Sequence, residues 1–217
     1  MKTITDHIRD HIAGDLVAYE ALQRGVLNLR AYGRSVKTAI EADRLEKTDL
    51  GTLTVALSRL QKELQAKPPL TPPLVLNDLT LQTPLCDITY AKHTVTKAEL
   101  EAVATLIRTD NKDFSAITQA YREVTIIAPS RLRQQIEQAI KSRPDYAQDE
   151  LFAATVHFSI DYLRVPNIIY ALLASLAAHE VNIVEVISTG TELSVIITKD
   201  NVDTVTRALQ QFLKPAD

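Results

Sequence analysis

Apolar residues recur at helical spacing in the first part of the chain. Leu53, Leu57 and Leu60 lie at positions i, i+4 and i+7, so they share one face of a helix that begins after Thr48 or Asp49. Such a stripe is typical of a helix that packs against neighbours on one side and meets water on the other. The spacing therefore predicts a helix with a buried leucine face.

Two other stretches of this part also predict helices. One runs from Asn28, a good N-cap residue, to near Arg44. Residues 3–24 predict one or two more, with a break at Gly14–Asp15. We therefore expect a helical domain over residues 1–66, and short helices joined by tight turns are compatible with a helix-turn-helix.

Prolines interrupt this pattern at residues 67–74, which read KPPLTPPL. Four prolines in eight positions cannot continue a helix or lie within a central strand. We therefore expect a stiff linker over residues 67–75. Beyond it, stretches typical of strands alternate with stretches typical of helices.

An internal repeat follows the linker. Residues 84–142 align with residues 153–211 at a constant offset of 69 without gaps, and Glu123 falls on Glu192. Apolar positions coincide across predicted strands and helices alike, which indicates two copies of one structural unit. The coinciding pairs include Leu100 with Ile169, Val103 with Leu172, Ile107 with Leu176, Phe114 with Ile183, Ile117 with Val186 and Ile126 with Val195.

Each copy predicts the order strand, helix, strand, strand, helix. In the second copy the first strand covers about residues 152–162 and the first helix begins at residue 168. This order predicts an α+β fold with two ferredoxin-like units, at residues 76–145 and 150–217, each with helices on one face of an antiparallel sheet. A fourth strand is not evident in either copy, and residues 74–83 predict an extra strand that would fill one such gap.

Composition narrows the range of functions. With 24 Lys+Arg against 27 Asp+Glu the formal net charge is −3, so no global positive field points to nucleic acid. Cys86 is the single cysteine, which excludes an internal disulfide framework and a cysteine-rich zinc site. The charged start lacks the apolar core of a signal peptide, and no run of about 18 uncharged apolar residues would span a membrane. We expect a cytoplasmic protein with no membrane partner.

The sequence contains no recognisable catalytic constellation. Phosphate-binding glycine motifs are absent, and no histidine is grouped with a Ser or Cys nucleophile. His7 and His11 lie at i and i+4, a spacing that suits a metal, but a solvated polar face is the simpler interpretation because further ligands are absent. We therefore expect a protein that is not an enzyme and that needs no cofactor or metal.

Basic residues in the helical part leave two interpretations open. Residues 1–66 hold ten Lys+Arg and nine Asp+Glu, a net charge of only +1. Clustering matters more than this sum for a surface that contacts phosphates. A DNA-binding surface and a dimerising helical bundle both remain open. The candidate DNA-contacting residues are Arg24, Arg30, Arg34, Lys37, Lys47 and Arg59.

Three features of the second copy carry a family resemblance. They are the turn Val165-Pro166-Asn167-Ile168, the segment Val181-Asn182-Ile183 and the hairpin STGTELSVII at 188–197. Through them the second copy resembles an ACT domain, the small ligand-sensing module of amino-acid metabolism, and looks most like the tandem ACT tail of aspartate kinases. The first copy is identified mainly through the repeat. No part of the chain resembles the kinase catalytic domain.

The resemblance implies a site and a partner. ACT domains usually pair side by side into one continuous sheet, which implies a homodimer. Many bind a small amino acid at that interface, near the turn that opens the first helix. Where the family most often has glycine after the proline, this chain has Asn167, a residue that tolerates unusual φ angles and can cap a helix. The ligand-binding residues implied here are Asp161, Val165, Pro166, Asn167, Ile168, Asn182 and Ile183.

The two helix starts differ in a way that matters for such a ligand. A helix start leaves N–H groups unpaired and partly positive, so a carboxylate can bind there. In the first copy Thr96 and Glu99 form a capping-box sequence that satisfies those groups. Ile168 aligns with Glu99 in the second copy, so no internal carboxylate competes there. We predict that a ligand binds the second copy; the alternative is that both helix starts are simply capped.

These patterns together predict a non-enzymatic regulator that senses a small amino acid. With a helix-turn-helix at its start, it would be a ligand-responsive transcriptional regulator. Two other classes remain open on the sequence. One is a free-standing regulatory subunit of an amino-acid biosynthetic enzyme, and the other is an interaction module that no longer binds a ligand.

Overall fold

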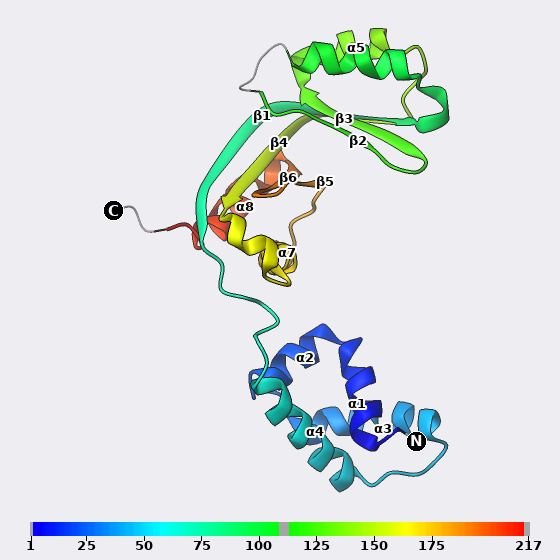
Figure 1. Ribbon diagram of the computed structural model, residues 1–217, viewed down its shortest axis with the longest axis vertical. Helices are drawn as coiled ribbons and strands as arrows, with labels where there is room; N and C mark the ends of the chain where they lie inside the picture. The colour runs from blue at the N-terminus through cyan, green and yellow to red at the C-terminus, as the bar shows by residue number, and fades with distance from the viewer. Residues whose placement is uncertain (1, 109–112, 215–217) are drawn as a thin grey trace. The chain divides into compact units, whose positions relative to one another are not determined.

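The computed structural model describes residues 2–108 and 113–214. Two compact units divide the chain, Met1–Pro72 and Pro73–Asp217 (Figure 1). The boundary falls between two consecutive prolines of the proline-rich segment. Among the described residues, no helix combines the length and the apolar character needed to cross a membrane.

The first unit is helical. Asn28 caps α3 by accepting from the Ala31 amide, and Asp49 caps α4, so both predicted N-caps are confirmed. The predicted break at Gly14–Asp15 separates α1 from α2. In the described residues 2–72 the helices are α1 (Ile4–Ala13), α2 (Leu16–Gln23), α3 (Leu29–Arg44) and α4 (Leu50–Gln65).

The leucine stripe predicted for α4 is buried as expected. Leu53, Leu57 and Leu60 are each 0% exposed. They share one core with Ile8 and Ile12 of α1. Burying a leucine side chain stabilises a fold by roughly 1.5–3 kcal/mol, so this stripe is the main apolar contribution of α4 to the unit.

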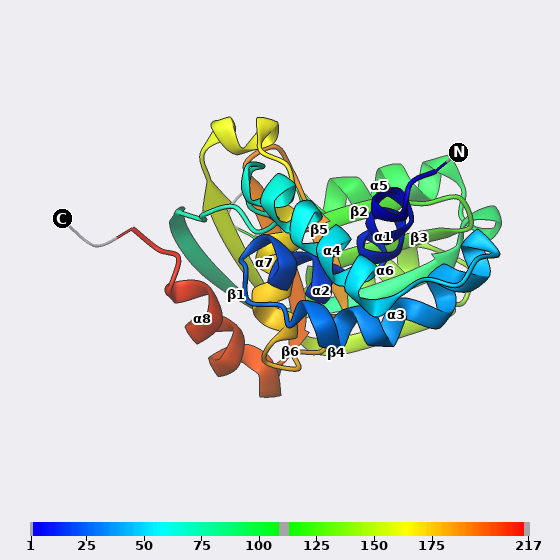
Figure 2. The same ribbon diagram turned by 90° about the horizontal axis from the view of Figure 1, so that it is seen from below.

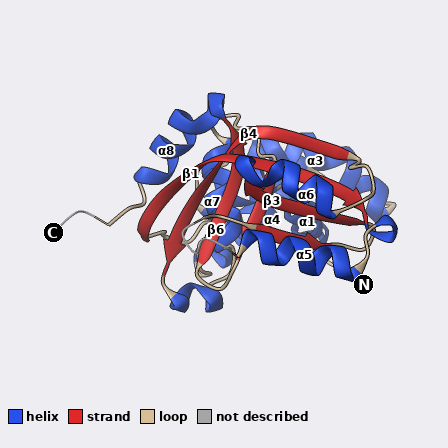
Figure 3. Cartoon of the chain, turned by 90° about the horizontal axis from the view of Figure 1, so that it is seen from above, coloured by secondary structure: helices blue, strands red, loops and turns tan. Residues whose placement is uncertain are grey.

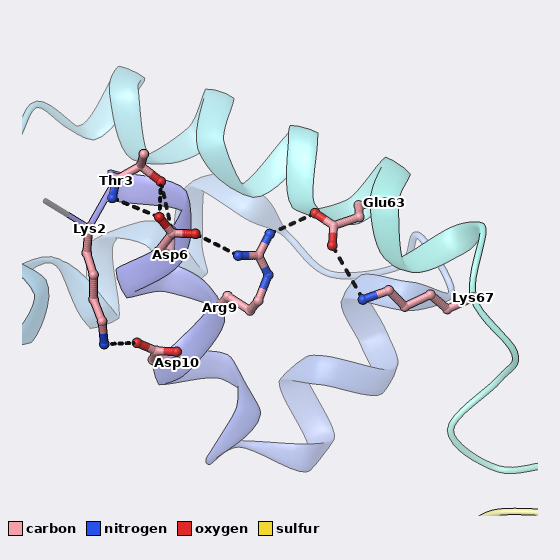
Figure 4. Close-up of polar contacts among 7 residues, drawn as sticks. All are labelled: Lys2, Thr3, Asp6, Arg9, Asp10, Glu63 and Lys67. Atoms are coloured by element: carbon pink, nitrogen blue, oxygen red, sulfur yellow. Dashed lines mark hydrogen bonds and ion pairs between the residues drawn. The ribbon is translucent and has the colours of Figure 1, made fainter.

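A chain of ion pairs on the surface joins α1 to α4 (Figure 4). Arg9 contacts Asp6 of its own helix and Glu63 of α4, each at 2.8 Å. Thr3 forms a capping box with Asp6, and hydrogen bonds from Thr3 lower the pKa of Asp6 to about 2. Glu63 also accepts from Lys67 at 3.4 Å. Exposed pairs of this kind contribute little to stability, so the buried core holds α1 on α4.

A buried glutamine holds the start of the proline-rich segment on this unit. The side-chain nitrogen of Gln23 donates to the carbonyl oxygens of Leu64 at 3.1 Å and Pro68 at 2.8 Å, with a longer contact to Lys67 at 3.5 Å. Its side-chain oxygen accepts from the Leu70 amide at 3.0 Å. Buried backbone groups need hydrogen-bond partners. The Gln23 side chain supplies them to an irregular segment that does not pair with a strand and is not part of a helix.

The second unit is built on an antiparallel sheet. Its strands, which are labelled in Figure 2, lie in the order β2-β3-β1-β4-β6-β5. The predicted α+β fold with an antiparallel sheet is therefore confirmed. In residues 73–108 and 113–214 the strands are β1 (Leu76–Ala91), β2 (Ala116–Gln119), β3 (Glu123–Pro129), β4 (Tyr146–Phe158), β5 (Glu185–Ser188) and β6 (Glu192–Thr198).

The same elements recur in both halves of this unit at the spacing found in the sequence. Strands β2 and β3 begin and end 69 residues before β5 and β6. Helices α5 and α6 in the first half correspond to α7 and α8 in the second. The helices are α5 (Lys97–Ile107), α6 (Arg133–Ala139), α7 (Ile168–Ala177) and α8 (Val202–Gln210).

Two long strands supply the fourth strand that neither copy revealed in its sequence. Residues 76–82 of β1 pair with residues 153–158 of β4 and so extend the second half. Residues 146–151 of β4 pair with residues 85–89 of β1 and extend the first half. Figure 3 labels both long strands, β1 and β4. The extra strand predicted at residues 74–83 is thus not separate, because it continues directly into the first strand of the first copy.

Alternating side chains divide the sheet into two faces. In β3, Ile126 packs with α5 and α6 whereas Ile127 belongs to a different cluster, and in β6 Val195 and Ile196 differ in the same way. Because successive strand residues point to opposite faces, the helices share one face. The other face buries a smaller cluster that includes the register partners Leu85 and Leu151.

The helix-free face also buries a carboxyl group. Asp87 is 2% exposed and lies opposite Ile127 of β3. Burial, and secondly the charge of Glu185, raise the pKa of Asp87 to about 6. The Thr89 hydroxyl donates to this carboxylate at 3.4 Å and opposes the shift. The face is therefore sensitive to pH in a range where ordinary carboxyl groups are already ionised.

Candidate ligand pocket

No side chain of its own caps the start of α7. The N-cap Asn167 has a left-handed backbone, with φ 68° and ψ 15°, and its side chain makes no hydrogen bond to the helix. Asparagine adopts this conformation more readily than most residues other than glycine. The expectation that Asn167 tolerates an unusual φ is confirmed, and the alternative in which its side chain caps the helix is wrong. The first amides of α7 thus keep the partial positive charge of a helix start.

A pocket of about 370 Å³ opens at this helix start. Phe158 and Ile168 form its buried wall, and these residues are 4% and 5% exposed. The ring of Tyr162 packs edge to face against the ring of Phe158, with 6.1 Å between the two ring centroids. Not one lining side chain is charged. The lining residues are Phe158, Tyr162, Leu163, Val165, Asn167, Ile168, Ile169, Tyr170, Ser188 and Thr189.

Three of the seven residues implied by the resemblance lie in this lining: Val165, Asn167 and Ile168. The other four lie outside it. The carboxylate of Asp161 accepts from the Ser159 hydroxyl at 3.0 Å, and Ile183 packs against the core beneath α7 and α8. Pro166 and Asn182 are exposed on the described surface. The pocket therefore uses the turn before α7 but not the segment that follows the helix.

Sequence reasoning missed the whole aromatic part of the lining, Phe158, Tyr162 and Tyr170. Tyr162 lies in a short 3-10 helix, Ile160–Arg164, which follows β4 where an extension of the strand was expected. Ser188 and Thr189 belong to the hairpin that carried the family resemblance, so their nearness to the turn was accessible in principle. Tyr170 is the third residue of α7, so the helical period alone places it in the first turn.

The equivalent pocket of the first half differs in charge and in capping. It measures about 590 Å³ and includes Lys92, Lys97 and Glu101 in its wall. The predicted capping box is confirmed: the Thr96 amide donates to the Glu99 carboxylate at 2.7 Å and the Glu99 amide donates back to the Thr96 hydroxyl at 3.3 Å. The bond from the Thr96 amide is the main cause that keeps the pKa of Glu99 below its usual value. The start of α5 is thus already capped by Thr96 and Glu99.

The basic residues of the helical unit form a surface of mixed sign. Arg24 lies 3.8 Å from Glu20 and Lys37 lies 3.7 Å from Glu41, so two of the six candidates face acidic partners on their own helices. The other four are exposed: Arg30, Arg34, Lys47 and Arg59. This arrangement does not single out a phosphate-binding surface.

No family model and no curated protein matches the sequence. Several solved structures match the fold. One is the regulatory subunit of aspartate kinase from Thermus thermophilus, at 12% identity and a TM-score of 0.51, with 64% of this chain and 100% of that chain covered.

Two whole aspartate kinases match in the same way. The enzyme from Clostridium acetobutylicum is 10% identical with a TM-score of 0.53, and the match covers 64% of this chain and 35% of that one. The enzyme from Synechocystis is 14% identical with a TM-score of 0.51, and the match covers 76% and 31%. This chain therefore spans about a third of their length. At such identities the likeness is one of fold alone, and it extends over 64% of this chain in the first two matches and 76% in the third.

Proposed function

We propose that this chain is an amino-acid-sensing regulatory protein whose second unit consists of two ACT domains, the second of which binds the ligand. The observation that carries the proposal is the pocket at the uncapped start of α7. The α-carboxylate of an amino acid would accept from the first amides of this helix, which need no basic side chain to attract an anion. The side chain of the ligand would then pack against Phe158 and Ile168.

The uncharged lining favours an amino acid with an apolar side chain. A lysine ammonium or a second carboxylate would lose hydration in this pocket without gaining an opposite charge, which is costly. Leucine, isoleucine and phenylalanine carry no such cost.

The fold likeness supports a regulatory rather than a catalytic role. The match covers the whole of a chain described as a regulatory subunit, which favours a second, more specific candidate: a free-standing subunit that acts on an amino-acid biosynthetic enzyme. A transcriptional role has no comparable support, and two of the six candidate basic residues, Arg24 and Lys37, face acidic partners. We also expect a homodimer, and native mass spectrometry of the purified protein would report copy number together with any retained amino acid.

Calorimetry with six amino acids tests the proposal. L-leucine, L-isoleucine and L-phenylalanine are expected to bind, and L-lysine, L-aspartate and L-threonine to bind more weakly or not at all. In an Ile169→Asp variant, a carboxylate at the exposed pocket rim would repel the ligand carboxylate, so affinity should fall at least about tenfold, roughly 1.4 kcal/mol. The matched control is Ile160→Asp, which changes an exposed isoleucine outside the lining.

Two results would contradict the proposal. If none of the six amino acids binds, the second half is an interaction module that does not sense a ligand of this class. If Ile160→Asp weakens binding as much as Ile169→Asp does, the ligand lies elsewhere than at the start of α7.

A further inference from the structure

One tyrosine of the pocket also holds the segment that joins the two units. The Tyr162 hydroxyl accepts from the Val75 amide at 3.0 Å and reaches the Pro73 carbonyl oxygen at 3.5 Å. Its ring lines the pocket and packs on Phe158. The same side chain therefore faces the candidate ligand with its ring and the joining segment with its hydroxyl.

The segment is fixed on both sides of a short joint. On the first unit, the Gln23 side chain binds the Pro68 carbonyl and the Leu70 amide, and the Thr71 hydroxyl donates to Glu20 at 3.1 Å. On the second unit, Leu74 packs against the core and β1 begins two residues later. Pro72 alone lies between these two sets of anchors, because the Pro73 carbonyl oxygen is 3.5 Å from the Tyr162 hydroxyl.

This joint is stiff because of its sequence. Each proline has φ fixed near −65°, and each residue that precedes a proline is restricted to extended conformations. Thr71 and Pro72 both precede a proline. Such a joint transmits a displacement of one end to the other, whereas a flexible linker of glycine and serine would absorb it.

We propose that Tyr162 couples occupancy of the α7 pocket to this joint, so that ligand binding is passed to the segment anchored on the helical unit. The inference rests on the proposed function and adds how ligand binding would reach the helical unit. A ligand packed against the ring restricts the motion of Tyr162 and strengthens the hydrogen bond from the Val75 amide to its hydroxyl. The stiff joint then carries this change to residue Leu70 and its contact with Gln23. By linkage, the state of the joint changes ligand affinity by the same factor.

Two backbone amides report the two sides of the joint: Val75, which donates to Tyr162, and Leu70, which donates to Gln23. Their chemical shifts and hydrogen exchange would be followed by NMR in the full chain. The probe is the tightest binder among L-leucine, L-isoleucine and L-phenylalanine. In the wild type, both amides should respond to it.

The decisive variant is Tyr162→Phe, which keeps the ring and removes the hydroxyl. Without ligand, its Val75 amide should exchange roughly fivefold faster, as expected for the loss of one hydrogen bond. At saturating ligand the Leu70 response should disappear, and because the joint and the ligand are linked, the affinity measured by calorimetry should fall but stay detectable. The matched control is Tyr170→Phe, which removes a hydroxyl from the same pocket but none of the contacts to the joint.

The outcomes separate the two proposals. If the probe binds the wild type but Leu70 does not respond, or if Tyr162→Phe keeps the full response, the coupling is wrong and the proposed sensing stands. If Tyr170→Phe loses the response as well, the hydroxyl of Tyr162 is not the link. If calorimetry detects no binding of any of the three amino acids, the sensing proposal fails and the coupling fails with it.

Discussion

At the scale of single residues, two positions are unusual for the residue they hold: Asp87 is a buried carboxyl group, and Asn167 has a left-handed backbone. The alternation of β1 places the Asp87 carboxyl on the helix-free face, beside apolar side chains. Asn167 has a positive φ at the start of α7. The strand pattern around Asp87 is visible in the sequence, but its burial is not, because an antiparallel sheet with helices on one face often leaves its other face in contact with solvent.

Asp87→Asn is expected to stabilise the protein at neutral pH. The pKa of Asp87 is about 6 in the fold against an ordinary 3.8, so the folded state binds its proton more tightly than the unfolded state. Its contribution to stability is fully present below about pH 4 and is lost as pH rises through 6. The amide variant avoids that loss, and its free energy of unfolding at pH 7 should exceed the wild-type value by on the order of 1–3 kcal/mol.

Urea unfolding at pH 4 and at pH 7 would measure this effect. The difference between variant and wild type should nearly vanish at the lower pH. Asp78→Asn, an exposed carboxylate on the same strand, serves as the control and should change stability by less than about 0.5 kcal/mol at either pH. A variant that is less stable than wild type at pH 7 would show that the ionised Asp87 is favourably paired.

At the scale of elements, the starts of α5 and α7 are the informative pair. The capping-box residues Thr96 and Glu99 were recognisable by their spacing alone, and the structure has both reciprocal bonds. The opposite behaviour of Asn167 was only partly foreseeable. Asparagine suits both an N-cap and a left-handed turn, and sequence spacing does not decide between them.

Substitutions at these two helix starts should have opposite effects. Thr96→Ala removes a cap and should lower the free energy of unfolding by about 1 kcal/mol. Asn167→Gly removes no cap and relieves a positive φ, so thermal unfolding should be unchanged or slightly raised. Asn167→Ala should cost about 1–2 kcal/mol through backbone strain. If Asn167→Gly proved as destabilising as Thr96→Ala, the Asn167 side chain would be capping α7 after all.

Strand pairing was the least predictable property of the elements. The existence of a strand near residues 74–83 followed from the residue pattern, but its partner did not. Pairing of residues 76–82 with 153–158 depends on contacts far apart in the chain, and a period of two specifies which face a residue occupies but not which strand lies beside it. The register of the pairing also shifts between Gln82 and Leu85.

At the scale of the molecule, the exchange of strand ends makes the two halves of the second unit interdependent. Neither half has four strands without a segment of the other's long strand. The repeat and the linker were readable from the sequence because both are local or periodic. The interdependence was not, because each copy taken alone looks like a separate small domain.

We therefore expect the second unit to unfold as one cooperative body. Ile136→Ala in α6 and Leu209→Ala in α8 each open a buried site and should cost about 2–5 kcal/mol. Either change should speed amide exchange in β3 and in β6 alike. Leu57→Ala in the helical unit is the control and should leave both strands unaffected. Faster exchange in β6 alone after Leu209→Ala would mean that the halves unfold separately.

The long strand β1 also has a consequence for synthesis on the ribosome. Residues 76–82 emerge well before their partners at 153–158, an interval of several seconds at roughly 5–20 residues per second. Throughout it, Leu79 and Leu81 lie on an unpaired strand edge, the kind of surface that invites association with other nascent chains. The first half can be completed only when residues 146–151 have been made, so translation must pass the middle of the unit before either half of the sheet has all its strands.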